Sequence, residues 1–252
     1  MREGYNKQMP HPILTCLTRP LPGPLTRLLR AVGAALVLCT LAACAGQEEL
    51  PLGRLPDGTV SVLLTHIQGI GEDGRRRIAA LEVHKDWDGL AKFAEENIAA
   101  NRNIADWWLV AGYAHAQAGR NARSIEYFTE RVRLAPDDLL GWNLLAQSYR
   151  DTGRPQRAVQ TLNNAHLVRQ GTPATWYLLG ESYSDLDRFL PAAAAYREAV
   201  QLERGFAQAW FGLGRAYSRL GRRPEYEQAL KALEPLDPAL AKKLAELRPG
   251  PR

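Results

Sequence analysis

Cysteine is scarce in this 252-residue chain. All three cysteines fall within the first 44 residues, and residues 45–252 contain none. The long remainder of the chain therefore cannot form a disulfide or build a cysteine-rich metal site.

Histidine is also sparse, with five residues in the chain. Four of them follow residue 43, and no two stand four residues apart like the ligand pair of a helical zinc site: His66, His84, His115 and His166. His115 is expected to pack in a core. No grouping of serine, histidine and an acidic residue stands out as a catalytic set. We therefore expect no metal, no cofactor and no catalytic residue, and a protein that is not an enzyme.

The uncharged apolar stretch at residues 31–43, AVGAALVLCTLAA, is short. A helix of this length rises about 20 Å, whereas a bilayer core is about 30 Å thick. Arg19, Arg27 and Arg30 precede the stretch and form a basic flank. This layout predicts a cleaved secretory signal rather than a permanent transmembrane helix.

The end of this stretch, Leu41-Ala42-Ala43-Cys44, resembles the lipobox of bacterial lipoprotein signal peptides. The resemblance implies that residues 1–43 are removed as a signal peptide and that Cys44 carries fatty acyl chains such as palmitate. Because Ala45 follows the cysteine, the resemblance also implies an outer-membrane lipoprotein facing the periplasm. A plain signal peptide with an unmodified Cys44 is the alternative.

The chain has no strong excess of one charge once this segment is removed. Residues 1–43 hold five of the 32 basic residues and one of the 27 acidic residues, so residues 44–252 carry a net charge of +1. A nucleic-acid interface requires a marked basic excess on one face. Nucleic acid is therefore excluded as the expected partner.

A tryptophan recurs every 34 residues, and the pattern around it recurs as well. The copy at Trp176 reads WYLLGESY and is followed by Ala192 and Tyr196. The other copies start at Trp108, Trp142 and Trp210. Over residues 105–238 these segments resemble the tetratricopeptide repeat family, whose repeat reads W-x2-L-G-x2-Y, then A-x3-F, then P.

The resemblance implies an all-α fold, a right-handed α-solenoid of about five helix-turn-helix units with a C-terminal capping helix. We expect a flexible linker at 44–70, with a possible short strand at 59–67, and a repeat domain at 71–247. The expected repeats cover 71–104, 105–138, 139–172, 173–206 and 207–240, and the capping helix runs to 247.

Glycine and other small residues stand at the positions where each unit needs them. The turn between the two helices contains Gly119, Gly153, Asp187 or Gly221, which can adopt the left-handed conformation that often ends a helix. The small residue four after each tryptophan lets the second helix approach closely: Gly112, Ala146, Gly180 and Gly214. The tryptophans themselves are predicted to lie in the repeat core.

Stacked repeats form an extended concave surface that binds partners. In this family the first helix of each unit lines that groove, which implies partner-binding roles for Leu109, Tyr113, Asn143, Gln147, Arg150, Tyr177, Glu181, Asp185, Phe211, Arg215 and Arg219. The set mixes aromatic, amide and charged groups, so the expected ligand is an extended protein segment. Tyr177 and Phe211 are the expected apolar anchors, and Arg215 and Arg219 are expected to bind acidic groups of that segment.

The stretch Gly69-Ile70-Gly71-Glu72-Asp73-Gly74 matches the spacing of a dinucleotide-binding loop. Glu72 and Asp73 would repel a pyrophosphate, and helical repeats leave no room for the parallel strands that such a loop requires. A hinge is the preferred interpretation.

The sequence thus indicates a membrane-anchored interaction scaffold or adaptor that works in cell-envelope assembly or secretion. Two alternatives remain, namely a self-assembling structural lipoprotein and an accessory subunit of an envelope enzyme complex.

Overall fold

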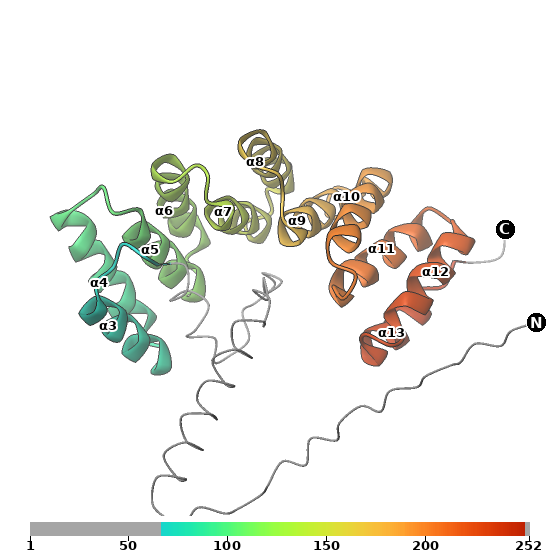
Figure 1. The fold of residues 1–252 in the computed structure, drawn as a ribbon, viewed down its shortest axis with the longest axis horizontal. Coiled ribbons are helices and arrows are strands. Elements are labelled where there is room, and N and C mark those ends of the chain that lie inside the picture. Colours follow the sequence, from blue (N-terminus) through green and yellow to red (C-terminus); the bar gives the residue numbers. More distant parts are fainter. Residues whose placement is uncertain (1–66, 250–252) are drawn as a thin grey trace, which may run out of the picture. The chain divides into compact units, whose positions relative to one another are not determined.

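The computed structural model describes residues 67–249, which form eleven α-helices (Figure 1). They are α3 (Glu72–Val83), α4 (Trp87–Ala100), α5 (Ala105–Gln117), α6 (Asn121–Leu134), α7 (Leu139–Asp151), α8 (Pro155–Val168), α9 (Pro173–Ser184), α10 (Phe189–Leu202), α11 (Ala207–Arg219), α12 (Arg223–Leu233) and α13 (Pro238–Ala245). The predicted signal peptide, Cys44 and nearly all of the predicted strand lie outside these residues. Among the described helices, none is long and apolar enough to cross a membrane.

The helices form five pairs followed by one more helix, and this confirms the predicted all-α solenoid. Each helix packs against the next along the chain, and the first helix α9 also contacts α7 and α11, the first helices of the neighbouring repeats. The first helices therefore form a continuous layer in the second half of the array. This layer is the surface on which side chains from successive repeats can meet.

The turn inside each repeat has the same backbone geometry. Gly119, Gly153 and Gly221 have φ angles of 73°, 69° and 67°, and Asp187 takes their place at 55°. The following amide closes the helix end by bonding five residues back, as Arg120 N does to His115 O at 2.8 Å. This bond belongs to the Schellman motif that left-handed residues make possible.

Close helix packing depends on the small residues of the first helices. A Cβ added at Gly112 would lie 2.5 Å from the Phe128 ring, and one added at Gly180 would lie 2.6 Å from the Tyr196 ring. Phe128 and Tyr196 are fully buried and belong to the second helices. A side chain at either glycine would therefore push the two helices of a repeat apart.

The tryptophans correct one prediction, because they are half-buried rather than part of the innermost core. Trp108, Trp142 and Trp210 each donate an indole hydrogen bond to the backbone carbonyl six residues earlier, at 2.9, 2.7 and 2.8 Å. Each of these bonds fastens the loop that enters the repeat. Trp176 differs, and its ring lies 4.1 Å from that of His166.

The terminal helices α3 and α13 each bury part of their apolar surface. In α3, Ile78 and Leu81 are buried, whereas Val83 is 67% exposed. In α13, Leu244 is fully buried, and a Cβ added at Gly214 would lie 2.5 Å from it.

The glycine-rich stretch before α3 attaches to the second repeat. The Gly69 amide donates to Asp106 Oδ2 at 2.6 Å, and Asp106 Oδ1 pairs with the buried Arg131 at 2.8 Å. Arg131 also pairs at 2.6 Å with Asp138, which caps the start of α7. The stretch is therefore held by a buried ion-pair network.

Candidate functional site

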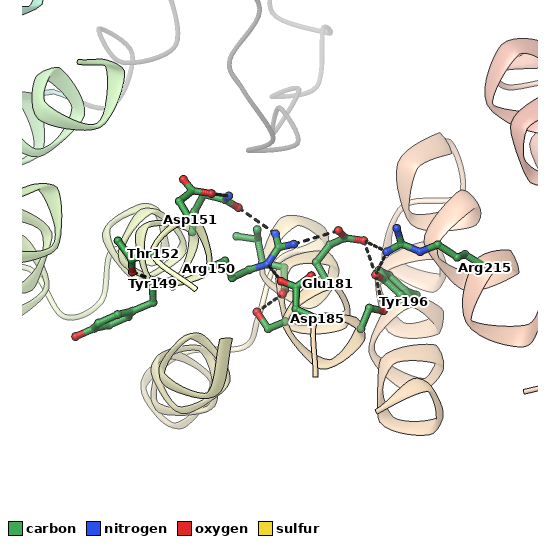
Figure 2. Close-up of polar contacts among 12 residues, drawn as sticks. Tyr149, Arg150, Asp151, Thr152, Glu181, Asp185, Tyr196 and Arg215 are labelled. Atoms are coloured by element: carbon green, nitrogen blue, oxygen red, sulfur yellow. Dashed lines mark hydrogen bonds and ion pairs between the residues drawn. The ribbon is translucent and has the colours of Figure 1, made fainter. Parts of the chain in front are cut away.

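Side chains from three successive first helices meet in one row of polar contacts (Figure 2). Glu181 of α9 stands between two arginines, with Arg150 Nη2 of α7 at 3.2 Å from Oε2 and Arg215 Nη2 of α11 at 2.9 Å from Oε1. Arg150 Nε also contacts Asp185 Oδ2 at 2.7 Å. We call these four residues the groove ladder. It links the third, fourth and fifth repeats.

The repeat register explains why these residues meet. Glu181 and Arg215 each stand five residues after the tryptophan of their repeat, and Arg150 stands eight after its own. Positions five and eight differ by three, so they lie on the same face of a helix. At the α7–α9 junction position eight therefore meets position five, and at the α9–α11 junction position five of one helix meets position five of the next.

A buried tyrosine, Tyr196, contacts two residues of the groove ladder. The hydroxyl of Tyr196 on α10 donates to Glu181 Oε1, and it lies 3.2 Å from Ser184 Oγ and 3.4 Å from Arg215 Nη2. Burial, followed by the charge of Glu181, raises the pKa of this tyrosine well above its usual value. Tyr196 thus stays protonated and can donate its proton to the carboxylate.

The charges of the ladder compensate one another. Burial by itself would lower the pKa of Arg150, but the hydrogen bond that Arg150 donates to Asp185 and the charges of Asp185 and Glu181 outweigh it, so the net shift is upward. Nearby, burial and the charge of Glu181 raise the pKa of Tyr177 to about 12. The surface therefore presents paired charges beside a neutral phenol.

The structure corrects three of the expected groove positions. Leu109 is fully enclosed, and Asn143 and Tyr113 are only 4% and 7% exposed. At two of the four copies the residue one after the tryptophan is thus buried, so it packs against protein instead of facing a ligand.

The other expected residues retain exposed surface. Gln147 donates to Asp151 Oδ1 at 2.7 Å on the exposed face of α7. Tyr177 and Phe211 are half-buried, and the guanidinium of Arg215 lies 6.0 Å from the Phe211 ring. Arg219 is 63% exposed and lies 5.1 Å from the Phe189 ring.

The sequence analysis did not identify one polar residue in the same repeat register, Glu82. Glu82 of α3 is 5% exposed and is hydrogen-bonded to Tyr113, five residues after Trp108. Burial raises the Glu82 pKa to about 7, against the lowering effect of that hydrogen bond. Glu82 stands eight residues after Gly74, which occupies the tryptophan position of the first repeat. Arg150 stands at the same place in the third repeat, eight residues after Trp142. The 34-residue register was the signal that could have identified it.

The described residues contain no cluster of three or more histidine, cysteine or acidic side chains that could hold a metal ion.

Comparison with protein families matches the model of the tetratricopeptide repeat at residues 90–138, 109–175 and 177–241. Comparison with curated proteins finds no match.

Solved structures share the fold at low sequence identity. A crystal structure of MamA is 21% identical with a TM-score of 0.59, over 68% of this chain and 93% of that one. YrrB, described as a TPR protein with an unusual peptide-binding site, is 13% identical with a TM-score of 0.56, over 74% and 99% of the two chains. TTC0263, a thermophilic TPR protein in Thermus thermophilus, is 19% identical with a TM-score of 0.53, over 69% and 97%.

Proposed function

The chain belongs to the tetratricopeptide repeat family, and from this premise we propose that it is a membrane-anchored adaptor that binds an extended segment of a partner protein along its first helices. The groove ladder carries this proposal, because it brings side chains of α7, α9 and α11 onto one surface. Repeat proteins use such continuous surfaces to bind partners. The similarity to YrrB, which has a peptide-binding site, supports a peptide segment as the ligand class.

The charge pairing indicates how such a segment would be recognised. Arg150 and Arg215 already share Glu181, so an acidic group of the partner would have to compete with that carboxylate. Arg219 is more exposed, at 63%, and lies 4.0 Å from Asp187. We therefore assign the apolar contacts to Tyr177 and Phe211 and the first acidic contact to Arg219.

The proposed membrane anchor rests on the sequence around Cys44. A lipobox-like Leu41-Ala42-Ala43-Cys44 follows an uncharged apolar stretch with a basic flank. Ala45 favours the outer membrane, and the adaptor would then act at the periplasmic face of the envelope. This placement would suit a role in envelope assembly or secretion.

A photocrosslinking residue in place of Phe211 tests the groove. We expect crosslinks from this position to a partner protein in cells, and none from the same residue in place of Arg197, an exposed position of the second helix α10. Crosslinks only to a second copy of the chain would instead support the self-assembling lipoprotein. Equal crosslinking from both positions would contradict the groove as the binding surface.

A variant confined to exposed positions complements this experiment. Gln147→Ala with Arg219→Glu changes the groove without removing a ladder residue. We expect it to lose the crosslink from position 211 while its circular dichroism spectrum stays unchanged. A variant that keeps the crosslink would show that these two side chains do not contact the partner.

A further inference from the structure

A pocket of about 760 Å³ lies between the second helices α4 and α6, which belong to the first two repeats. Its walls include two aromatic rings, Trp108 and Tyr127, and two aliphatic side chains, Ile98 and Ile125. A carboxylate, Glu95, also lines it. This volume is within the range of small-ligand sites. The groove ladder is on first helices of later repeats, so the pocket is a separate surface.

Glu95 belongs to a hydrogen-bond network behind the pocket. Its Oε1 accepts from the Tyr127 hydroxyl and lies 2.9 Å from His115 Nε2. His115 Nδ1 in turn accepts from Arg120 Nε at 2.8 Å. Because Nδ1 is the acceptor in that bond, Nε2 is the nitrogen that donates to Glu95.

The ionisation of Glu95 follows from these contacts. Burial by itself would raise its pKa, but the hydrogen bonds from Tyr127 and His115 and the nearby positive charges, that of Arg123 among them, together outweigh burial, so the pKa lies below its usual value. Both described hydrogen bonds use Oε1, which leaves Oε2 available to a ligand.

These residues depart from the repeat pattern of this chain. The position of His115 holds a tyrosine in the next three repeats, and the position of Glu95 holds Thr129, Asn163 and Arg197. The position of Tyr127 holds Thr161 and Ala195 in the next two repeats. Those repeats fold without the three side chains, so the fold does not require them. Their departures nevertheless meet in one network at one pocket.

We propose that this pocket binds a lysine or arginine side chain presented by a partner protein, with Glu95 as its counter-ion. The Trp108 and Tyr127 ring centroids are 6.0 Å apart and tilted by 44°, so the two rings contact each other and a cation would lie beside this aromatic pair, on the side that lines the pocket. Ile98 and Ile125 would pack against the aliphatic stem.

The charges at the rim are compatible with a cation. The lining contains three carboxylates, Glu95, Glu126 and Glu130, and two guanidinium groups, Arg102 and Arg123. Arg123 lies 4.0 Å from Glu126, and Glu130 pairs with Arg133 at 2.9 Å. Of these three carboxylates, Glu95 alone has no arginine within ion-pair distance among the described residues.

Nuclear magnetic resonance of the full-length protein can test the site through the Trp108 indole N–H. The probes are acetyl-Gly-Lys-Gly-amide, the same peptide with arginine, and the same peptide with norleucine, which has an uncharged stem. We expect a saturable shift with the lysine or arginine peptide and about tenfold weaker binding of the norleucine peptide, as for the loss of a charged hydrogen bond. Equal affinity for norleucine, or no saturable shift with any peptide, would overturn the proposal.

Two variants test whether Glu95 is the counter-ion of the basic peptides. Glu95→Gln should weaken binding of the basic peptides by about tenfold, whereas Glu126→Gln at the exposed rim should change it by less than about twofold. Unchanged affinity in a folded Glu95→Gln protein would also overturn the proposal. If Glu95→Gln does not fold, the peptide series on the unmodified protein still decides.

Discussion

Arg150 of α7 and Glu181 of α9 form an ion pair at 3.2 Å across the junction between the third and fourth repeats, and their side chains are only 15% and 16% exposed. A pair with this little exposure is screened less by salt than a surface pair. Glu181 also receives Arg215 and the Tyr196 hydroxyl, so one carboxylate stabilises two junctions. The row of contacts that forms the proposed binding surface is therefore also part of what holds the repeats together.

Removing the central carboxylate should therefore destabilise the array. We expect Glu181→Ala to lower the free energy of unfolding by about 2 kcal/mol, because the largely buried Arg150 and the partly exposed Arg215 lose their shared partner. Urea denaturation followed by circular dichroism measures it. Arg219→Ala, which removes a 63% exposed charge, is the matched control and should cost less than about 0.5 kcal/mol. Equal effects of the two changes would contradict the structural role of the ladder.

The small residues of the first helices predict an overpacking effect. Gly180→Ala would place a Cβ 2.6 Å from the buried Tyr196 ring, so it should destabilise the protein by about 1–3 kcal/mol. Gly205→Ala is the control, because a Cβ there meets nothing within 4 Å. Thermal unfolding of both variants makes the comparison. A stable Gly180→Ala protein would mean that the helices are packed less closely than the structure shows.

Glu82 predicts a pH dependence of α3 docking. Its pKa is raised from 4.5 to about 7 in the folded protein, so the folded state binds more protons than the unfolded state between these values. The contribution of Glu82 to stability is therefore fully present below pH 4.5 and is lost as the pH rises to about 7. At one pKa unit per about 1.4 kcal/mol, the loss amounts to up to about 3 kcal/mol.

Glu82→Gln isolates this effect, because the amide keeps the shape and stays uncharged. We expect the variant to lose the pH dependence and to be more stable than the original protein above pH 7. Hydrogen exchange of α3 amides at several pH values measures it. If the exchange rates of the two proteins follow the same pH profile after correction for intrinsic rates, Glu82 does not control the docking of α3.

The tryptophan hydrogen bonds predict a graded effect of substitution. Trp142→Phe keeps an aromatic ring but removes the bond to the Pro136 carbonyl, so it should cost about 1 kcal/mol. Trp142→Ala also removes packing and should cost about 3 kcal/mol or more. Because repeats are stabilised mainly by their neighbours, hydrogen exchange should increase first in α6 to α9. Trp176→Phe is the control, since the indole of Trp176 has no backbone acceptor among the described contacts.

The proposed anchor predicts that Cys44 is acylated. The protein should incorporate a fatty-acid analogue and partition with membranes, because each buried methylene contributes about 0.8 kcal/mol. Cys44→Ala should abolish the label and leave an unprocessed or released form. A protein without label that still fractionates with membranes would contradict acylation at Cys44.

The sequence by itself determined the helix pairs and their turns. The 34-residue recurrence of tryptophan and the residues Gly119, Gly153, Asp187 and Gly221 were sufficient, because apolar periodicity and left-handed backbone conformations are local properties of the chain. The close approach at Gly112 and Gly180 followed from the same register.

Only the tertiary structure decided which side chains reach one another across a repeat junction. Residues at equivalent positions differ in their surroundings, so Tyr113 is buried beside Glu82 whereas Arg215 is paired with Glu181 at the surface. The network of Glu95, His115 and Tyr127 likewise joins residues up to 32 positions apart. Such contacts depend on how each helix pair is rotated against the next, and that rotation is set by the packing of whole repeats rather than by any local stretch of sequence.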